Sequence, residues 1–303
     1  MESRSAFRGI LWTVVGLLLV AHVGGGWYYA NRIIDEGFVP DPDPIVTSSG
    51  DYELFEVSYQ APLGQMDAWH LPADGTTWVI HVHGLGATPA EAEHLFAPLQ
   101  EAGYPQLAIM FRNDQGQPVD PSGYYRYGVT EFEDIAGAMD FARANGADSI
   151  VFSGFSTGSS HILSFVFKNN LDDIKGMFFD SPNIDLGDTV DFRGSMEELP
   201  ILPFNVPITL TWVAKFFTSL RIDVNWKSID YVAKASNSLR IPVLVHHGIE
   251  DQSVPITQSI ALAEAQPDLV RLIQVPGAGH VASYEMDPGA YVGEILHFLD
   301  QVG

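Results

Sequence analysis

The feature that most constrains the fold of this chain is the pentapeptide Gly154-Phe155-Ser156-Thr157-Gly158. An apolar run, residues 149–152, leads directly into it, and a helix is expected over residues 159–168. A serine that projects from the end of a buried strand needs a sharp turn, and the residues two before and two after it must be very small because strand and helix close on them. Gly154 and Gly158 meet this requirement. The segment is therefore interpreted as a nucleophile elbow with Ser156 at its apex.

A serine nucleophile needs a base and an orienting acid, which in this kind of sheet follow in the order Ser, Asp or Glu, then His. Asp251 lies in a loop after an apolar strand, and His280 lies in a glycine-rich loop after the next strand. Of the ten histidines, only His280 follows a strand late in the chain and precedes the terminal helix. Ser156, Asp251 and His280 are the candidate catalytic residues. Glu250, beside Asp251, and Asp180, at the end of an earlier strand, remain alternatives for the acid.

Four segments together resemble the α/β-hydrolases: His83-Gly84-Leu85-Gly86, the elbow at Ser156, the loop His247 to Pro255, and Gly277 to His280. The resemblance covers about Trp69 to the C-terminus. It implies an oxyanion hole made by the backbone N–H groups that follow the His-Gly pair and the nucleophile. By position, these donors would be Leu85 and Thr157.

A looser resemblance concerns the segment from Phe111 to Glu131. This stretch is similar to bacterial hydrolases of the serine aminopeptidase-like and BEM46-like groups, many of which are single-pass membrane proteins. It implies a membrane-bound enzyme and says little about the chemistry.

The rest of the chain predicts an α/β fold, in which apolar strands alternate with helices and form a mostly parallel sheet covered on both faces. Thr88 is expected to cap a helix from Pro89 to Ala102. Thr130 and Glu133 are expected to form the capping box of a helix that ends near residue 145. The expected strands are residues 78–82, 107–111, 149–152, 176–180, 241–246 and 270–275, and the terminal helix is residues 288–299.

More chain lies between Pro182 and Arg240 than a crossover helix needs, which predicts a lid at about residues 183–240. Two interpretations of its apolar residues stay open: they wall an acyl pocket, or residues 215–222 form a helix that packs on the sheet. Tyr124, Tyr125 and Tyr127 likewise either line the pocket or pack in a loop. The apolar residues of the lid are Ile201, Leu202, Phe204, Val206, Ile208, Leu210, Trp212, Phe216, Phe217, Leu220 and Trp226.

The N-terminus carries a second strong pattern. Arg4 and Arg8 precede an apolar run from Gly9 to Ala30, with aromatic residues at both ends. This is typical of a membrane span with its basic end in the cytoplasm. The predicted organisation is a cytoplasmic N-terminus (1–8), a transmembrane anchor (9–30), a linker (31–51) and an extracytoplasmic hydrolase domain (52–303).

The competing interpretation of this run is a cleaved signal peptide, which would make the protein secreted; Gly24 and Gly26 are small enough for a cleavage site. Under the favoured interpretation, the linker prolines at 40, 42 and 44 form a semi-rigid spacer that lifts the domain off the bilayer. No candidate site residue precedes His83, so the domain alone is expected to be active.

Composition narrows the classes of partner. The formal charge of −23 disfavours binding of nucleic acid. The chain has no cysteine, which excludes disulfides and thiolate metal sites. His81 and His83 have no third ligand nearby and there is no HExxH helix, so neither a metal nor another cofactor is expected. The expected partners are a small acyl substrate and, through the N-terminal helix, a lipid bilayer; protein partners are unknown.

The pattern as a whole predicts a membrane-anchored serine hydrolase that cleaves a carboxylic ester or related acyl substrate through an acyl-enzyme. A peptidase or acyltransferase that uses the same serine is an alternative, as is a hydrolase-like protein that binds a ligand without turnover. The residues do not separate ester, thioester, amide and peptide substrates, because that choice lies in the shape of the pocket.

Overall fold

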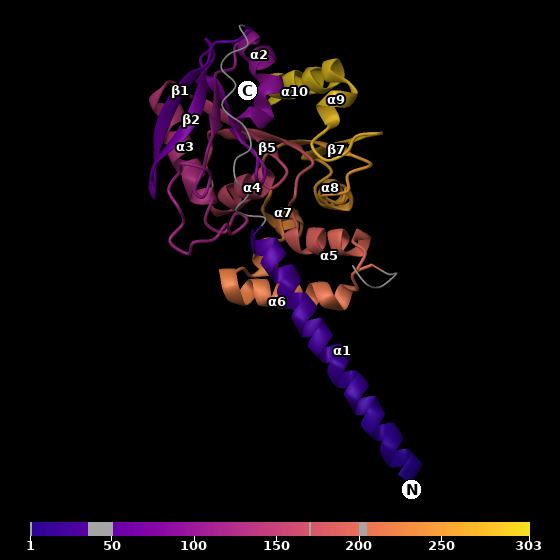
Figure 1. Cartoon of the computed structure of the whole chain (residues 1–303). Helices are drawn as coiled ribbons and strands as arrows, with labels where there is room; N and C mark the ends of the chain where they lie inside the picture. Colours follow the sequence, from indigo (N-terminus) through magenta and orange to yellow (C-terminus); the bar gives the residue numbers. More distant parts are fainter. Residues whose placement is uncertain (1, 36–50, 170, 200–204) are drawn as a thin grey trace.

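A sheet of eight strands organises the computed structural model of the chain (Figure 1). The structure describes residues 2–35, 51–169, 171–199 and 205–303. The strand order is β1-β2-β4-β3-β5-β6-β7-β8; β2 runs antiparallel to β1 and β4, and the other neighbours are parallel. The strands are β1 (Phe55–Ala61), β2 (Gly64–Leu71), β3 (Thr77–Val82), β4 (Gln106–Ile109), β5 (Ser149–Phe155), β6 (Ile174–Asp180), β7 (Val243–Gly248) and β8 (Val270–Val275).

Helices cover both faces of this sheet, and each face has its own apolar core. One core contains side chains of α3, α4, α7 and α8, and the other contains side chains of α2 and α10. The predicted α/β class with a mostly parallel sheet is thereby confirmed. The helices of the two layers are α2 (Glu93–Glu101), α3 (Phe132–Ala144), α4 (Gly158–Lys168), α7 (Tyr231–Ser238), α8 (Thr257–Ala265), α9 (Ser283–Met286) and α10 (Pro288–Val302).

The two predicted helix caps have different outcomes. Thr88 accepts a hydrogen bond from the Ala90 N–H at 3.3 Å, and the helix begins as a 3₁₀ turn, η2 (Pro89–Ala92), before α2. The capping box at Thr130 is wrong, because α3 begins at Phe132 and its first turn has no side-chain cap. The preceding Glu131 folds back and accepts the Gly128 N–H at 2.8 Å, which sets a different path into the helix.

Between β6 and β7, in the region where a lid is expected, the chain leaves the sheet and returns. It forms α5 (Leu186–Met196), α6 (Ile208–Ile222) and η3 (Trp226–Ser228) before α7 rejoins the sheet layers. An isolated bridge between Asp185 and Asp230 closes the base of this excursion. Three lid residues named from the sequence, Ile201, Leu202 and Phe204, lie outside the described residues.

The N-terminal segment is one continuous helix, α1 (Glu2–Asp35), of which Arg8–Asp35 is long and apolar enough to cross a membrane. Figure 1 shows α1 projecting away from the sheet layers and α6 lying across its C-terminal part. The helix continues through residues 31–35, which the sequence analysis assigns to the linker. The linker prolines at 40, 42 and 44 lie outside the described residues.

Glycines of α1 allow its close contact with α6. A Cβ atom added at Gly26 would lie closer than 3.0 Å to the side chain of Val213, and one added at Gly25 would lie 2.9 Å from Leu210 Cδ1. Close approach of helices at small residues is the usual way in which membrane helices pack. Gly26 therefore has a packing role that accounts for it without a cleavage site, whereas a Cβ at Gly24, the other small residue of the candidate cleavage site, meets nothing within 4 Å.

Gly26→Leu is expected to destabilise the protein, because the new side chain overlaps Val213 and overpacking costs about 1–3 kcal/mol. Gly16→Leu is the matched control, since a Cβ there meets nothing within 4 Å. Thermal unfolding of the full chain in detergent is the measurement, and a loss of about 1–3 kcal/mol corresponds to several degrees in Tm. Equal Tm values for the two variants would contradict the α1–α6 packing.

Candidate active site

Ser156 sits in the sharp turn between β5 and α4, with a positive φ of 47° that non-glycine residues adopt at a cost. The flanking glycines are sterically required. A Cβ at Gly158 would lie closer than 3.0 Å to the carbonyl oxygens of Val82 and His83, and one at Gly154 would lie 2.8 Å from Ile162 Cδ1. The turn thus has the geometry expected of a nucleophile elbow.

The structure brings together the three residues that the sequence proposes as a triad. His280 Nε2 lies 2.9 Å from Ser156 Oγ, and His280 Nδ1 lies 2.7 Å from Asp251 Oδ2. The three side chains follow the carboxyl ends of β5, β7 and β8, at one edge of the sheet. An imidazole between a hydroxyl and a carboxylate is arranged to take the hydroxyl proton while the carboxylate holds its tautomer.

The Asp251 carboxylate has several hydrogen-bond partners in addition to His280. Its Oδ1 accepts the N–H groups of Ser253 and Val254 at 2.7 and 2.9 Å, and its Oδ2 lies 3.3 Å from His247 Nε2. Burial alone would raise the pKa of Asp251, but hydrogen bonds from His247, His280 and the Val254 N–H outweigh it and hold the pKa well below its usual range. Asp251 therefore stays ionised at neutral pH, as a partner of an imidazolium must.

His247 is a positioning residue whose role the sequence analysis missed. Its Nδ1 lies 2.7 Å from Ser259 Oγ, and its Nε2 faces Val254 O at 3.2 Å as well as Asp251. The imidazole is fully buried and braces the loop that carries the acid. Its place directly after the expected strand 241–246 was the one available signal, and in the structure it lies inside β7.

The two alternative acids lie elsewhere. The Glu250 side chain is exposed. Asp180 accepts hydrogen bonds from Ser283 Oγ at 2.9 Å and Ser181 Oγ at 3.2 Å, which tie β6 to α9. Burial raises the pKa of Asp180 to about 6 against the effect of these hydrogen bonds. Among the residues described, only Asp251 of these three carboxylates is within hydrogen-bond distance of His280.

The proposed oxyanion donors flank the serine. Leu85 and Thr157 both line the cavity that contains Ser156 and His280. In the described part of the chain, neither of their N–H groups has a hydrogen-bond acceptor. The neighbouring Gly84 N–H is bound by Glu91 Oε2 at 2.7 Å, which fixes the turn. Two fixed, unoccupied N–H donors beside a serine suit a developing oxyanion.

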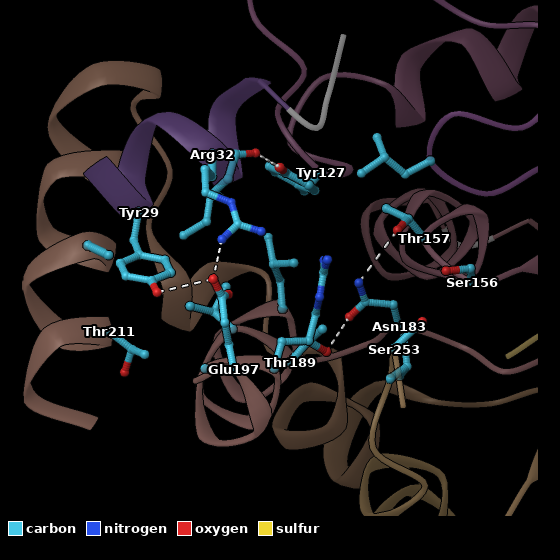
Figure 2. A pocket seen from close by; sticks show the side chains of 18 of the residues that line it. Tyr29, Arg32, Tyr127, Ser156, Thr157, Asn183, Thr189, Glu197, Thr211 and Ser253 are labelled. Carbon is cyan, nitrogen blue, oxygen red and sulfur yellow. Dashed lines mark hydrogen bonds and ion pairs between the residues drawn. The ribbon is translucent and has the colours of Figure 1, made fainter. Parts of the chain in front are cut away.

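A cavity of about 290 Å³ extends from Ser156 toward the lid and α1 (Figure 2). Thr211 and Ala214 of α6 line it together with residues of α5. Tyr127 is the one of the three loop tyrosines that reaches the cavity, and its hydroxyl donates to the carbonyl of Ile33. Thr211 and Ala214 form part of the cavity wall, but none of the apolar lid residues named from the sequence does so in the described part of the chain. Residues 215–222 are helical as expected, in a helix that packs mainly on α1 and α5 instead of on the sheet.

The N-terminal helix forms part of the same wall, which the sequence analysis did not foresee. Tyr29, Arg32 and Ile33 of α1 line the cavity. Figure 2 shows Tyr29 and Arg32 converging on Glu197 at the end of α5; the Tyr29 hydroxyl donates to this carboxylate at 3.2 Å, and Arg32 forms an ion pair with it. The cavity thus has a polar end at α1, and near the serine its lining mixes Leu85 and Val254 with Thr157, Asn183 and Ser253.

Solved structures similar to this chain share its sheet topology and define the α/β-hydrolase fold. An esterase from Pyrococcus furiosus superimposes with a TM-score of 0.65 at 22% identity, over 87% of this chain and 100% of that chain. A thermophilic esterase from Thermogutta terrifontis gives a TM-score of 0.57 at 17% identity, over 82% and 99%. An acylaminoacyl peptidase from Pyrococcus horikoshii gives 0.62 at 16% identity, over 83% of this chain and 42% of that one.

These likenesses confirm the predicted α/β-hydrolase fold. No protein-family model matches the chain, and no curated protein matches it in sequence. In the ranges that the structure describes, no three His, Cys, Asp or Glu side chains are grouped so as to hold a metal ion.

The free energy of unfolding of Asp180→Asn, relative to that of the native protein, is expected to rise with pH. The folded state binds the Asp180 proton up to about pH 6, whereas the unfolded state releases it near pH 4. The free energy of unfolding of the native protein therefore decreases by about 3 kcal/mol as the pH rises from about 4 to about 6, and it keeps the lower value above pH 6. Thermal unfolding of both proteins at pH 4 and pH 7.5 is the measurement.

The same variant separates a structural acid from a catalytic one. Asp180→Asn should keep its kcat within a few-fold, whereas Asp251→Asn should lose a factor on the order of 10³ or more through the wrong imidazole tautomer. The reverse outcome would transfer the orienting role to Asp180.

Proposed function

We propose that this protein is a serine hydrolase that cleaves a carboxylic ester or a related acyl substrate through an acyl-enzyme. The observation that carries the proposal is the hydrogen-bonded chain from Ser156 Oγ through His280 to Asp251. Solved esterases with the same fold support it. The same geometry would serve an amide bond, and one structural neighbour is an acylaminoacyl peptidase.

The proposed mechanism assigns every proton transfer to His280 and the stabilisation of charge to Asp251 and two N–H groups. His280 takes the proton of Ser156 as Oγ bonds to the carbonyl carbon, and Asp251 stabilises the imidazolium. The N–H groups of Leu85 and Thr157 bind the oxyanion. The bond to the leaving group then breaks, and His280 returns the proton to that group. In the second half of the reaction, His280 takes a proton from water as the water oxygen bonds to the acyl carbon. The bond from that carbon to Ser156 Oγ then breaks, the acid leaves, and His280 returns the proton to Oγ.

We also propose that α1 is an uncleaved anchor, so that the protein spans the cell membrane once with its catalytic domain outside the cytoplasm. Arg4 and Arg8 at the N-terminal end support this orientation. The matched packing of Gly25 and Gly26 on α6 supports a retained helix over a cleaved signal peptide. The acidic charge of the chain makes nucleic acid an unsuitable partner. Similarity to BEM46-like hydrolases stays a prediction.

Ser156→Ala is expected to abolish both labelling by a fluorophosphonate probe and hydrolysis of 4-nitrophenyl acetate, because the hydroxyl is the only group lost. Ser159→Ala, in the following helix turn, is the matched control and should keep both. A Ser156→Ala protein that is labelled or turns over at the native rate would refute the assignment of the nucleophile.

A chain that begins at Asp41 is expected to keep turnover of 4-nitrophenyl acetate, since no residue of the triad or oxyanion hole precedes His83. Its KM for a long-chain ester should rise roughly tenfold, the effect of about 1.4 kcal/mol of lost contact with Tyr29, Arg32 and Ile33. A chain that lacks only residues 2–7 is the control and should match the full chain. Equal KM values for all three would exclude α1 from the substrate site.

A further inference from the structure

The exposed side of α6 is unusually apolar for a helix outside the core. Four large apolar residues recur at every fourth position and leave most of their surface open: Ile208 54%, Trp212 58%, Phe216 58% and Leu220 68%. No acidic residue lies between Ile208 and Ile222, although the chain has 38 acidic residues against 15 basic ones. A contiguous apolar stripe on a helix marks a surface that contacts a partner or a membrane.

This stripe faces away from the catalytic domain. The buried residues of α6, among them Leu210, Ala214 and Thr218, recur at the same spacing but are offset by two positions, which puts them on the other side of the helix. That side meets α5 and lines the cavity through Thr211 and Ala214. The apolar stripe is therefore on the side of α6 opposite these contacts. Figure 1 shows α1 projecting beyond α6, away from the sheet layers.

The position along the predicted membrane span of α1 at which α6 makes contact indicates what covers the stripe. A helix needs about 20 residues to cross an apolar layer of about 30 Å, so a span that starts at Gly9 ends near Tyr28. The contacts with α6 fall on this end of the span. They are His22 Nε2 to Thr209 Oγ1 at 2.9 Å, Gly25 against Leu210, Gly26 against Val213, Trp27 against Phe217 with ring centroids 5.3 Å apart, and Asn31 with Arg221.

We propose that the stripe Ile208, Trp212, Phe216 and Leu220 lies in the interface of the bilayer that α1 spans, and that Ser156 acts on the acyl group of an amphiphile resident in that bilayer. The proposal rests on the proposed function, since it names the substrate class of the same site. Tryptophan side chains, such as those of Trp27 and Trp212, are enriched at the membrane–water interface.

The cavity is built to receive such a molecule. It lies between the end of the span and the serine, with Tyr29, Arg32 and Glu197 at one end and Thr157 and Ser156 at the other (Figure 2). Tyr29, Arg32 and Glu197 suit the polar part of an amphiphile. Its acyl chain would contact the apolar residues of the lining, which are Ile33, Leu85, Leu186, Val190, Ala214 and Val254. An acyl ester therefore reaches the nucleophile from the membrane surface without crossing bulk water.

The membrane contact is tested on full-length protein reconstituted in phosphatidylcholine vesicles. The chain has no cysteine, so Phe216→Cys and Asp74→Cys each give a single site for a fluorophore. Asp74 is exposed in the turn before β3, at the edge of the sheet opposite the site. We expect spin labels near the lipid headgroups to quench the fluorophore at 216 and not at 74. Absence of quenching at 216 overturns the proposal, including when cross-linking shows that a second copy covers the face.

The substrate class is tested with two esters of one reporter, 4-methylumbelliferyl acetate in solution and the palmitate embedded in the vesicles. The double variant Trp212→Gln/Phe216→Gln should keep acetate turnover, because neither side chain lines the cavity. Its rate of hydrolysis of the palmitate should fall about tenfold or more, since the contacts of two aromatic side chains with lipid are lost. Phe55→Gln, at the exposed edge strand β1, is the control and should change neither rate.

The proposed function and the membrane-resident substrate are contradicted by different experimental results. If the native protein hydrolyses neither ester, or if Ser156→Ala hydrolyses them, the proposed function fails, while the quenching at position 216 still decides the membrane contact. If acetate hydrolysis depends on Ser156 but the palmitate rate is the same in the native protein and the double variant, the membrane-resident substrate is wrong and the hydrolase stands.

Discussion

The close approach of α4 to the end of β3 is the constraint on which the site depends. Gly158 has no Cβ, and this lets its backbone pack against the carbonyl oxygens of Val82 and His83. Only at that separation can the chain turn tightly enough to hold Ser156 at a positive φ above the sheet. The turn between Gly84 and Leu85, which follows β3, is thereby brought next to the serine. The absence of one methyl group thus positions both Ser156 and the N–H groups of the proposed oxyanion hole.

The parts of the fold that were predictable from the sequence are those whose signal is local. The run into Ser156, the small residues around it, and the strands that precede Asp251 and His280 each carry their own pattern of apolar residues and glycines. Strand ends were less accurate for a similarly local reason. β7 begins at Val243 instead of residue 241, because Pro242 has no N–H to donate to the ladder.

Other features depend on packing between distant segments, which no local pattern contains. His247 braces Asp251 through contacts with Ser259 that exist only once α8 has docked. The wall that α1 contributes to the cavity requires the lid to fold across residues 22–31. In the sequence, the glycines that permit this contact are indistinguishable from the small residues of a cleavage site. Thr130 failed as a cap because Glu131 is used by the turn before it.

Helix α1 is both the candidate membrane span and part of the cavity wall, so it cannot be exchanged for another apolar helix without changing the cavity. A single apolar helix is commonly regarded as an exchangeable tether, because any sequence of sufficient length and apolarity holds a domain at a bilayer. Here the last turns of the helix carry Tyr29, Arg32 and Ile33 into the cavity, and Gly25 and Gly26 fit the surface of α6. If α1 is the proposed anchor, a foreign helix of equal apolarity would hold the chain at the membrane and still leave one wall of the cavity around Ser156 missing. The C-terminal turns of α1 are therefore fixed by the shape of the cavity and of α6, and a substitution there changes the site as one in a packed core changes the fold.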